Sequence, residues 1–150
     1  MSPNDVPSKN ALVPREALVA IAIAAARADG SVLPCEADRI EDSVSALPMF
    51  RSQSVEATRA MFERVARRVA TGDITSVMRE AAEALPGPLK GTAFAIGEDV
   101  LLADGRMQAS ELQFVEQLRR VLRVRRSFAD AVVGVLRTKN LAWSDRHRLA

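Results

Sequence analysis

The stretch ARADGSVLPCE (residues 26–36) is followed 75 residues later by LLADGRMQASE (residues 101–111). In each copy an apolar run leads into Ala-Asp-Gly, an apolar residue stands two positions after the glycine, and a glutamate stands seven positions after the aspartate. The register extends outward, because Ala20-Ile21 falls on Ala95-Ile96. A glycine after an apolar helical run is a signal for a helix end. The chain is therefore predicted to contain two pseudo-equivalent helix–loop–helix units.

Helix formers and turn signals divide the rest of the chain. Alanine, leucine, arginine, glutamate and methionine dominate the sequence, and all of them favour helix. Pro14 suits the first turn of a helix, Ser54 and Asp73 suit N-caps, and Pro86-Gly87-Pro88 is a strong break. We expect an all-α bundle of about seven helices, at residues 14–28, 34–47, 55–70, 74–85, 89–103, 109–122 and 125–138.

The length of 150 residues is close to the commonest size of a single domain. Residues 1–13, which hold Pro3 and Pro7, are predicted to form a flexible leader. Residues 14–150 are predicted to form one helical domain, with repeat halves at about 14–70 and 88–138. After the last helix, Trp143 is expected to anchor a short terminal segment to the bundle.

The composition excludes several classes of protein. Hydrophobic residues make up 48% and charged residues 27% of the chain, which is typical of a globular protein. No apolar run approaches the ~18 residues of a membrane span, and no secretory signal is recognisable. One Cys and one His can form neither an internal disulfide nor a Cys/His zinc site, and His147 is a poor candidate for a catalytic base. We therefore expect a non-enzymatic protein of the cytoplasm.

The two Ala-Asp-Gly segments, with the apolar helix before each and the Glu after each, resemble the TerB-like domain, which is named for tellurite-resistance proteins. The resemblance covers about residues 14–138, and the second copy matches better. It implies an all-helical fold of two related halves, a role in tellurite resistance or a stress response, and acidic residues that form a metal-binding surface. It also implies kinship with a module of a J-domain co-chaperone.

The acidic loops are predicted to hold a divalent cation. An aspartate in the last turn of a helix lies at the negative end of the helix dipole, and this repulsion destabilises the helix by about 0.3–1 kcal/mol. A bound cation would offset the repulsion. Oxygen ligands of this kind suit Ca²⁺ or Mg²⁺. The predicted ligands are Asp104 and Glu111 as principal ligands, Glu98 or Asp99 in support, and Asp29 and Glu36 as a weaker second site.

A structural explanation of the same residues stays open. An aspartate before glycine commonly accepts hydrogen bonds from nearby backbone N–H groups. A glutamate early in a helix is favoured by the dipole without any metal. The spacing also differs from that of an EF-hand loop. Turn chemistry therefore accounts for all of these acids except Glu98 and Asp99.

The C-terminal third is strongly basic and is the second candidate site. Arg119, Arg123, Arg125 and Arg126 are predicted to bind an acidic protein partner, unless they are simply the solvated faces of helices. Nucleic acid is disfavoured as a partner, because no aromatic platform for base stacking accompanies these arginines. Binding to an anionic membrane surface and formation of a homodimer are left open.

Overall fold

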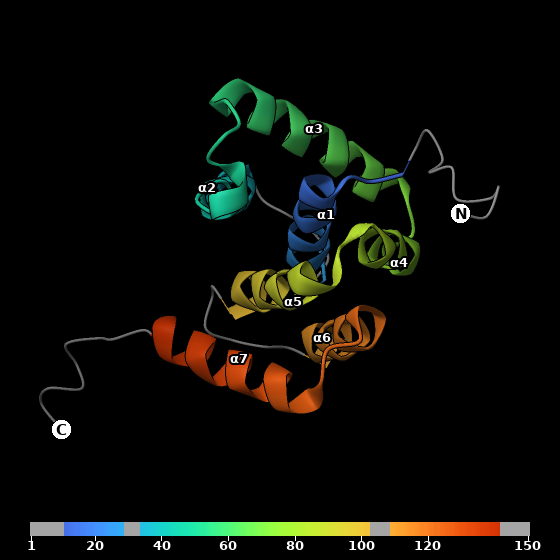
Figure 1. Cartoon of the computed structure of the whole chain (residues 1–150), viewed down its shortest axis with the longest axis vertical. Helices are drawn as coiled ribbons and strands as arrows, with labels where there is room; N and C mark the ends of the chain where they lie inside the picture. Colours follow the sequence, from blue (N-terminus) through green and yellow to red (C-terminus); the bar gives the residue numbers. More distant parts are fainter. Residues whose placement is uncertain (1–10, 29–33, 103–108, 142–150) are drawn as a thin grey trace, which may run out of the picture.

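The computed structural model describes residues 11–28, 34–102 and 109–141, and within these ranges it is helical and has no strand (Figure 1). The elements are α1 (Pro14–Ala26), α2 (Pro34–Ser45), the 3-10 helix η1 (Pro48–Phe50), α3 (Val55–Thr71), α4 (Ile74–Ala84), α5 (Gly87–Leu102), α6 (Ala109–Leu122) and α7 (Arg126–Lys139). The predicted all-α fold, with seven α-helices in the described ranges, is confirmed.

Helix α1 lies at the centre of the fold. Pro14 occupies its first turn, and the Glu16 carboxylate accepts a hydrogen bond from the Val13 N–H at 3.1 Å. Its residues are apolar on every side, and burial is continuous from Ala17 to Ala22. A helix that is apolar all round is stable only when other elements surround it. Accordingly, α1 packs against α2, α3, α4 and α5.

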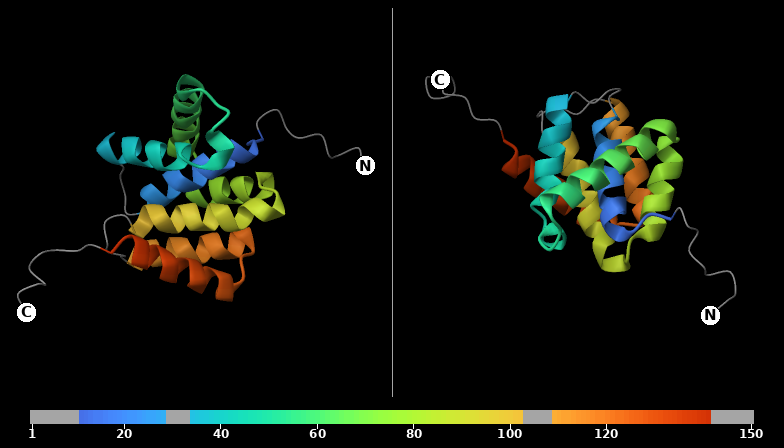
Figure 2. Two further views of the ribbon diagram at one scale, coloured as in Figure 1. Left: turned by 60° about the vertical axis from the view of Figure 1, so that its left-hand side comes forward. Right: turned by 90° about the horizontal axis from the view of Figure 1, so that it is seen from above.

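Helix α5 is the second helix with neighbours on opposite sides. It packs against α1 on one side and against α6 and α7 on the other. The molecule is therefore layered, with α2 and α3 followed by α1 and α4, then α5, and finally α6 and α7 (Figure 2). The two apolar segments that precede the Ala-Asp-Gly motifs thus form the two inner helices.

The predicted N-caps are confirmed. The Ser54 hydroxyl accepts a hydrogen bond from the Ala57 N–H at 3.1 Å, and the Asp73 carboxylate accepts one from the Ser76 N–H at 3.1 Å. Each bond satisfies a backbone donor that the first turn of a helix leaves without a partner. These two polar residues therefore set where α3 and α4 begin.

Several boundaries differ by a few residues from the sequence prediction. The second helix ends at Ser45 instead of Leu47, because Pro48 begins the separate turn η1. Helix α5 begins at Gly87 instead of Leu89, since Pro88 fits the first turn of a helix. Leu12, within the predicted leader, is only 7% exposed and belongs to the core, whereas residues 1–10 lie outside the described ranges.

A tight corner joins α6 to α7. Arg123 has a φ of 55°, in the left-handed region. Its N–H donates to the Arg120 carbonyl, and the Val124 N–H donates to the Arg119 carbonyl, both at 3.1 Å. This pattern is a Schellman motif, in which the hydrophobic residue after the left-handed one is buried, as Val124 is here. The corner lets α7 fold back over α5.

The predicted repeat has a partial counterpart in the helix positions. Helices α2 and α6 begin at Pro34 and Ala109, which are separated by the same 75 residues as the sequence motifs. Asp29, Gly30, Asp104 and Gly105 lie outside the described residues. The structural equivalence of the two halves therefore stays a prediction.

Candidate functional site

Four helix ends meet around a small cavity of about 40 Å³. It is lined by Ala25 and Ala26 of α1, Glu36, Arg39 and Ile40 of α2, Val100 and Leu101 of α5, and Glu111 of α6. The C-terminal turns of α1 and α5 thus face the N-terminal turns of α2 and α6. The volume is close to that of one water molecule or one ion.

Two of the predicted ligands, Glu36 and Glu111, are brought together at this cavity. Glu111 is 3% exposed and Glu36 is half-buried, and neither residue is without an interaction partner. Arg39 lines the same cavity and supplies a positive charge beside the two carboxylates. The two glutamates occupy equivalent positions in the sequence motifs, and α2 and α6 each contribute one of them to the lining of the cavity.

Asp99 is held by the end of α7. Its carboxylate accepts hydrogen bonds from Lys139 Nζ at 3.1 Å and from Asn140 Nδ2 at 2.9 Å. Together with Arg39 it lines a neighbouring cavity of about 170 Å³ between α2, α5 and the end of α7. This carboxylate therefore stabilises the docking of α7 and does not line the cavity of Glu36 and Glu111.

Glu98 has the opposite environment, although it is the adjacent residue. It is 1% exposed, and among the described residues neither of its carboxylate oxygens has a hydrogen-bond partner. Burial raises the pKa of the Glu98 carboxyl to about 7, and the positive charge of Arg137 only partly opposes this effect. Glu98 is therefore a buried acid that is readily protonated near neutral pH, and it does not line the small cavity.

The described residues do not by themselves complete a metal site. Among residues 11–28, 34–102 and 109–141, no group of three or more His, Cys, Asp or Glu side chains is arranged to hold a metal ion. The predicted ligands Asp29 and Asp104 lie outside these ranges, in the segments that lead directly into α2 and α6. The structure thus unites two of the six predicted ligands and separates Glu98 and Asp99 from them.

Glu116 forms ion pairs with two of the four arginines that were predicted to bind a partner. Arg119 is half-buried and donates to Glu116 at 2.7 Å, and Arg126 also reaches this carboxylate, at 3.3 Å. The hydrogen bond from Arg119 lowers the pKa of Glu116 to about 2. Arg123 and Arg125 are exposed and form no ion pair within the described part of the chain. Arg126 is also exposed, so three of the four predicted residues are accessible to a partner, and Arg119 is the most strongly engaged within the fold.

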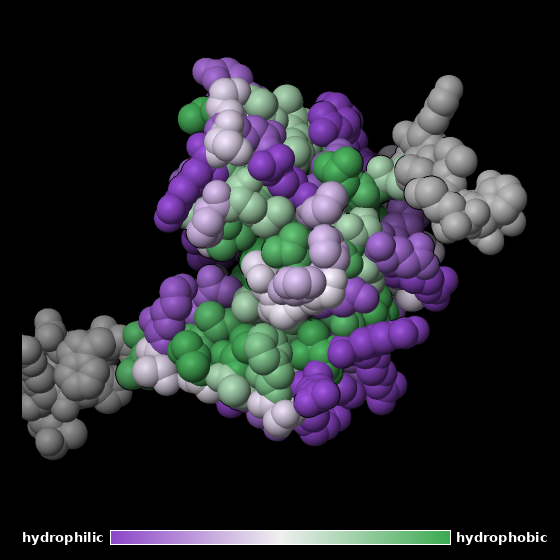
Figure 3. Space-filling model, viewed as in Figure 1, coloured by the Kyte–Doolittle hydropathy of each residue, from purple (hydrophilic) through white to green (hydrophobic). Residues whose placement is uncertain are grey.

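An exposed apolar surface on α7 was missed by the sequence analysis. Phe128, in the first turn of α7, is 46% exposed, and Val135, in the second half of the helix, is 67% exposed. Figure 3 shows hydrophobic surface gathered over α7 and the adjoining part of α5. The pattern of apolar and polar residues in α7 is that of an ordinary amphipathic helix. The sequence alone does not show whether another helix covers each apolar residue.

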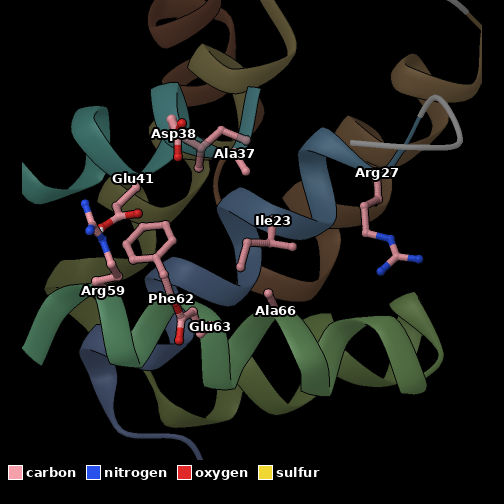
Figure 4. A pocket seen from close by; sticks show the side chains of 10 residues that line it. Ile23, Arg27, Ala37, Asp38, Glu41, Arg59, Phe62, Glu63 and Ala66 are labelled. Carbon is pink, nitrogen blue, oxygen red and sulfur yellow. Dashed lines mark ion pairs between the residues drawn. The ribbon is translucent and has the colours of Figure 1, made fainter. Parts of the chain in front are cut away.

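A larger groove, also missed, opens between α2 and α3 over the end of α1 (Figure 4). It has a volume of about 800 Å³. Ile23, Phe62 and Ala66 form its apolar floor, and Asp38, Glu41 and Glu63 are acids on its rim. Nothing in the local sequence pattern could reveal it, because the groove depends on the separation of two helices.

No helix within the described residues has the length and apolar character needed to cross a membrane. No curated protein and no solved structure matches the chain. A family model does match, and it is described as tellurite resistance protein TerB and covers residues 15–132. That range includes α1 from its second residue onward, the whole of α5 and both Ala-Asp-Gly motifs of the sequence. The chain therefore belongs to the TerB family of tellurite resistance proteins.

Proposed function

We propose that this TerB domain is a non-enzymatic module of the cytoplasm that binds a divalent cation, Ca²⁺ or Mg²⁺, in tellurite resistance or a related stress response. The observation that carries the proposal is the convergence of Glu36 and Glu111 on one cavity where four helices end. Glu36 and Glu111 lie 75 residues apart in the sequence. A cation bound by both would explain why both glutamates line the same cavity.

The donor chemistry fits a hard cation. Carboxylate oxygens and the carbonyls that end a helix are the ligands that Ca²⁺ and Mg²⁺ prefer. Glu36 and Glu111 would hold the ion, and Asp29 and Asp104, each seven residues before one of these glutamates, would complete the site. The bound ion would supply positive charge at the negative C-terminal ends of α1 and α5.

Titration of the protein with CaCl₂ and with MgCl₂, followed by amide NMR, tests the proposal. We expect shifts in residues 34–39 and 98–111, which Glu111→Gln removes and Glu36→Gln weakens. Glu80→Gln, on the outer face of α4, is the matched control and should bind as the unmodified protein does. Arg39→Gln should tighten binding, because it removes a competing positive charge from the cavity. No shifts at millimolar concentrations of either ion would overturn the proposal.

The cellular role needs a separate measurement. A strain without its own TerB function should regain growth on tellurite with the unmodified chain but not with the Glu36→Gln/Glu111→Gln variant. Equal expression of the two forms and equal growth without tellurite are the controls. Full resistance with the double variant would separate tellurite resistance from cation binding.

A second candidate function is that of a protein-interaction adaptor. It is favoured by the exposed Phe128 and Val135 on α7 and by Arg123 and Arg125, which precede this helix and are exposed and unpaired in the described part of the chain. Binding to an acidic partner should then persist in chelator and be lost on charge reversal at Arg123, Arg125 and Arg126. Loss in chelator would instead favour the cation-binding function.

A further inference from the structure

The groove between α2 and α3 has a distinct pattern of charge. Its floor is apolar, and at one end the rim acid Glu41 is engaged by Arg59, whose Nε lies 3.6 Å from Glu41 Oε1 (Figure 4). A second cation, Arg27, lines the opposite end of the groove, away from the three acids (Figure 4). The other two rim acids, Asp38 and Glu63, form no ion pair within the described residues. The groove therefore fits an apolar group accompanied by positive charge.

The chain leaves α7 close to this groove. Lys139 and Asn140, at the end of α7, line a cavity together with Ser43 and Ile40 of α2. Ile40 lines the groove as well. The end of α7 is thus separated from the groove by the thickness of α2, about 10 Å.

Residues 142–150, AWSDRHRLA, follow directly and lie outside the described ranges. Nine residues can extend over about 30 Å, which is enough to cross α2. They contain one large aromatic residue, Trp143, and the bases Arg146 and Arg148 against a single acid. Their chemistry therefore complements the apolar floor and the acidic rim.

We propose that residues 142–150 occupy the α2–α3 groove of their own chain. Trp143 covers the floor beside Phe62, and Arg146 and Arg148 pair with Asp38 and Glu63. The segment closes the gap between two helices that make few contacts with each other.

The fluorescence of Trp143 provides a direct test, because the chain has one Trp and no Tyr. In the full folded chain, we expect Trp143 emission to be shifted to the blue, and its quenching by acrylamide to be weaker, than in the same chain in urea. Identical emission and quenching in the two conditions would overturn the proposal.

Charge reversal tests the assigned groove. Asp38→Lys/Glu63→Lys should move the emission and the quenching to the values in urea, while the circular dichroism stays helical. The control Glu56→Lys/Glu83→Lys makes the same change of charge at exposed positions that do not line the groove and should leave both readouts unchanged. Equal effects of the two variants would refute the assignment.

A charge swap gives the sharpest result. Adding Arg146→Glu/Arg148→Glu to the Asp38→Lys/Glu63→Lys chain should restore the blue-shifted emission, because opposite charges face each other again. Failure of this rescue would overturn the pairing. A blue shift that increases with protein concentration would assign the groove to the segment of a second copy and would overturn the proposal that each chain fills its own groove.

Discussion

Gly97 of α5 lies directly against Leu118 of α6, so that a β-carbon at residue 97 would be 2.6 Å from Leu118 Cδ2. Leu118 is fully buried, which leaves its side chain little room to move away. The same position would bring a β-carbon to 3.5 Å from Ile21 of α1. The absence of a side chain at residue 97 therefore sets how closely α1, α5 and α6 pack.

We predict that Gly97→Ala destabilises the fold whereas Gly134→Ala stabilises it. Alanine gains up to about 1 kcal/mol of helix propensity at either site. No atom of the described residues lies within 4 Å of the β-carbon position at Gly134, so only this gain applies there. At Gly97 overpacking adds a loss of about 1–3 kcal/mol. Urea unfolding of the two variants should therefore give free energies of unfolding that differ by about that amount.

A double variant tests whether contact with Leu118 causes the loss of stability in Gly97→Ala. Leu118→Val removes the δ-carbons that a residue-97 methyl would meet, so Gly97→Ala/Leu118→Val should lose less stability than the two single losses together. Additive losses would show that the effect of Gly97→Ala does not come from contact with Leu118.

The second prediction concerns the pH dependence of stability. The pKa of Glu98 is raised from 4.5 to about 7 by burial, so the native state keeps a proton that the unfolded chain releases between these values. The free energy of unfolding should therefore fall as the pH rises through this window, by a total of about 3 kcal/mol. Urea unfolding between pH 4.5 and 8 measures this fall.

The control for this prediction is Glu98→Gln, which cannot titrate and should have a flatter pH dependence over the same range. Glu83→Gln, an exposed acid of α4, should keep the pH dependence of the unmodified protein. If Glu98→Gln retained the full dependence, another group would be responsible for it.

The corner between α6 and α7 yields a third prediction. Arg123 adopts the left-handed conformation, in which a residue with a β-carbon is less stable than glycine by about 1 kcal/mol. Arg123→Gly should therefore raise the free energy of unfolding by about this amount. Arg123→Ala removes the same charge but retains the β-carbon, so it should not give this gain. Equal gains in both variants would attribute the effect to charge.

A fourth prediction concerns the pKa of Glu116, whose carboxylate forms ion pairs with Arg119, Arg120 and Arg126. Glu116 should titrate with a pKa of about 2 in ¹³C NMR of its carboxyl group, mainly because Arg119 donates a hydrogen bond to it. Arg119→Met should raise this pKa further than Arg120→Met does, since Arg120 acts only through its charge. Equal shifts would show that the hydrogen bond is not the main cause.

The helices could be predicted because their causes are local. Ser54 and Asp73 start helices through bonds to residues three positions later, and the apolar run from Ala17 to Ala22 required burial whatever surrounded it. The boundary at Gly87 was missed by two residues, because Pro88 is equally compatible with a break and with a first turn.

The candidate site could be predicted only in part, because it depends on contacts between distant segments. Glu36 and Glu111 were singled out by their equivalent motif positions, but their meeting at one cavity follows from the packing of four helices. Glu98 and Asp99 are adjacent acids of the same helix, yet one is buried and the other is bound by Lys139. Which of them faces the interior is decided by where α6 and α7 pack.

The burial of α1 also constrains how the protein is made. This helix emerges from the ribosome before α4 and α5, which cover much of its surface. During synthesis about 75 more residues must be added after the end of α1 before both of these helices are complete. The nascent chain therefore passes through a long interval in which its most hydrophobic segment is open to chaperones and to aggregation.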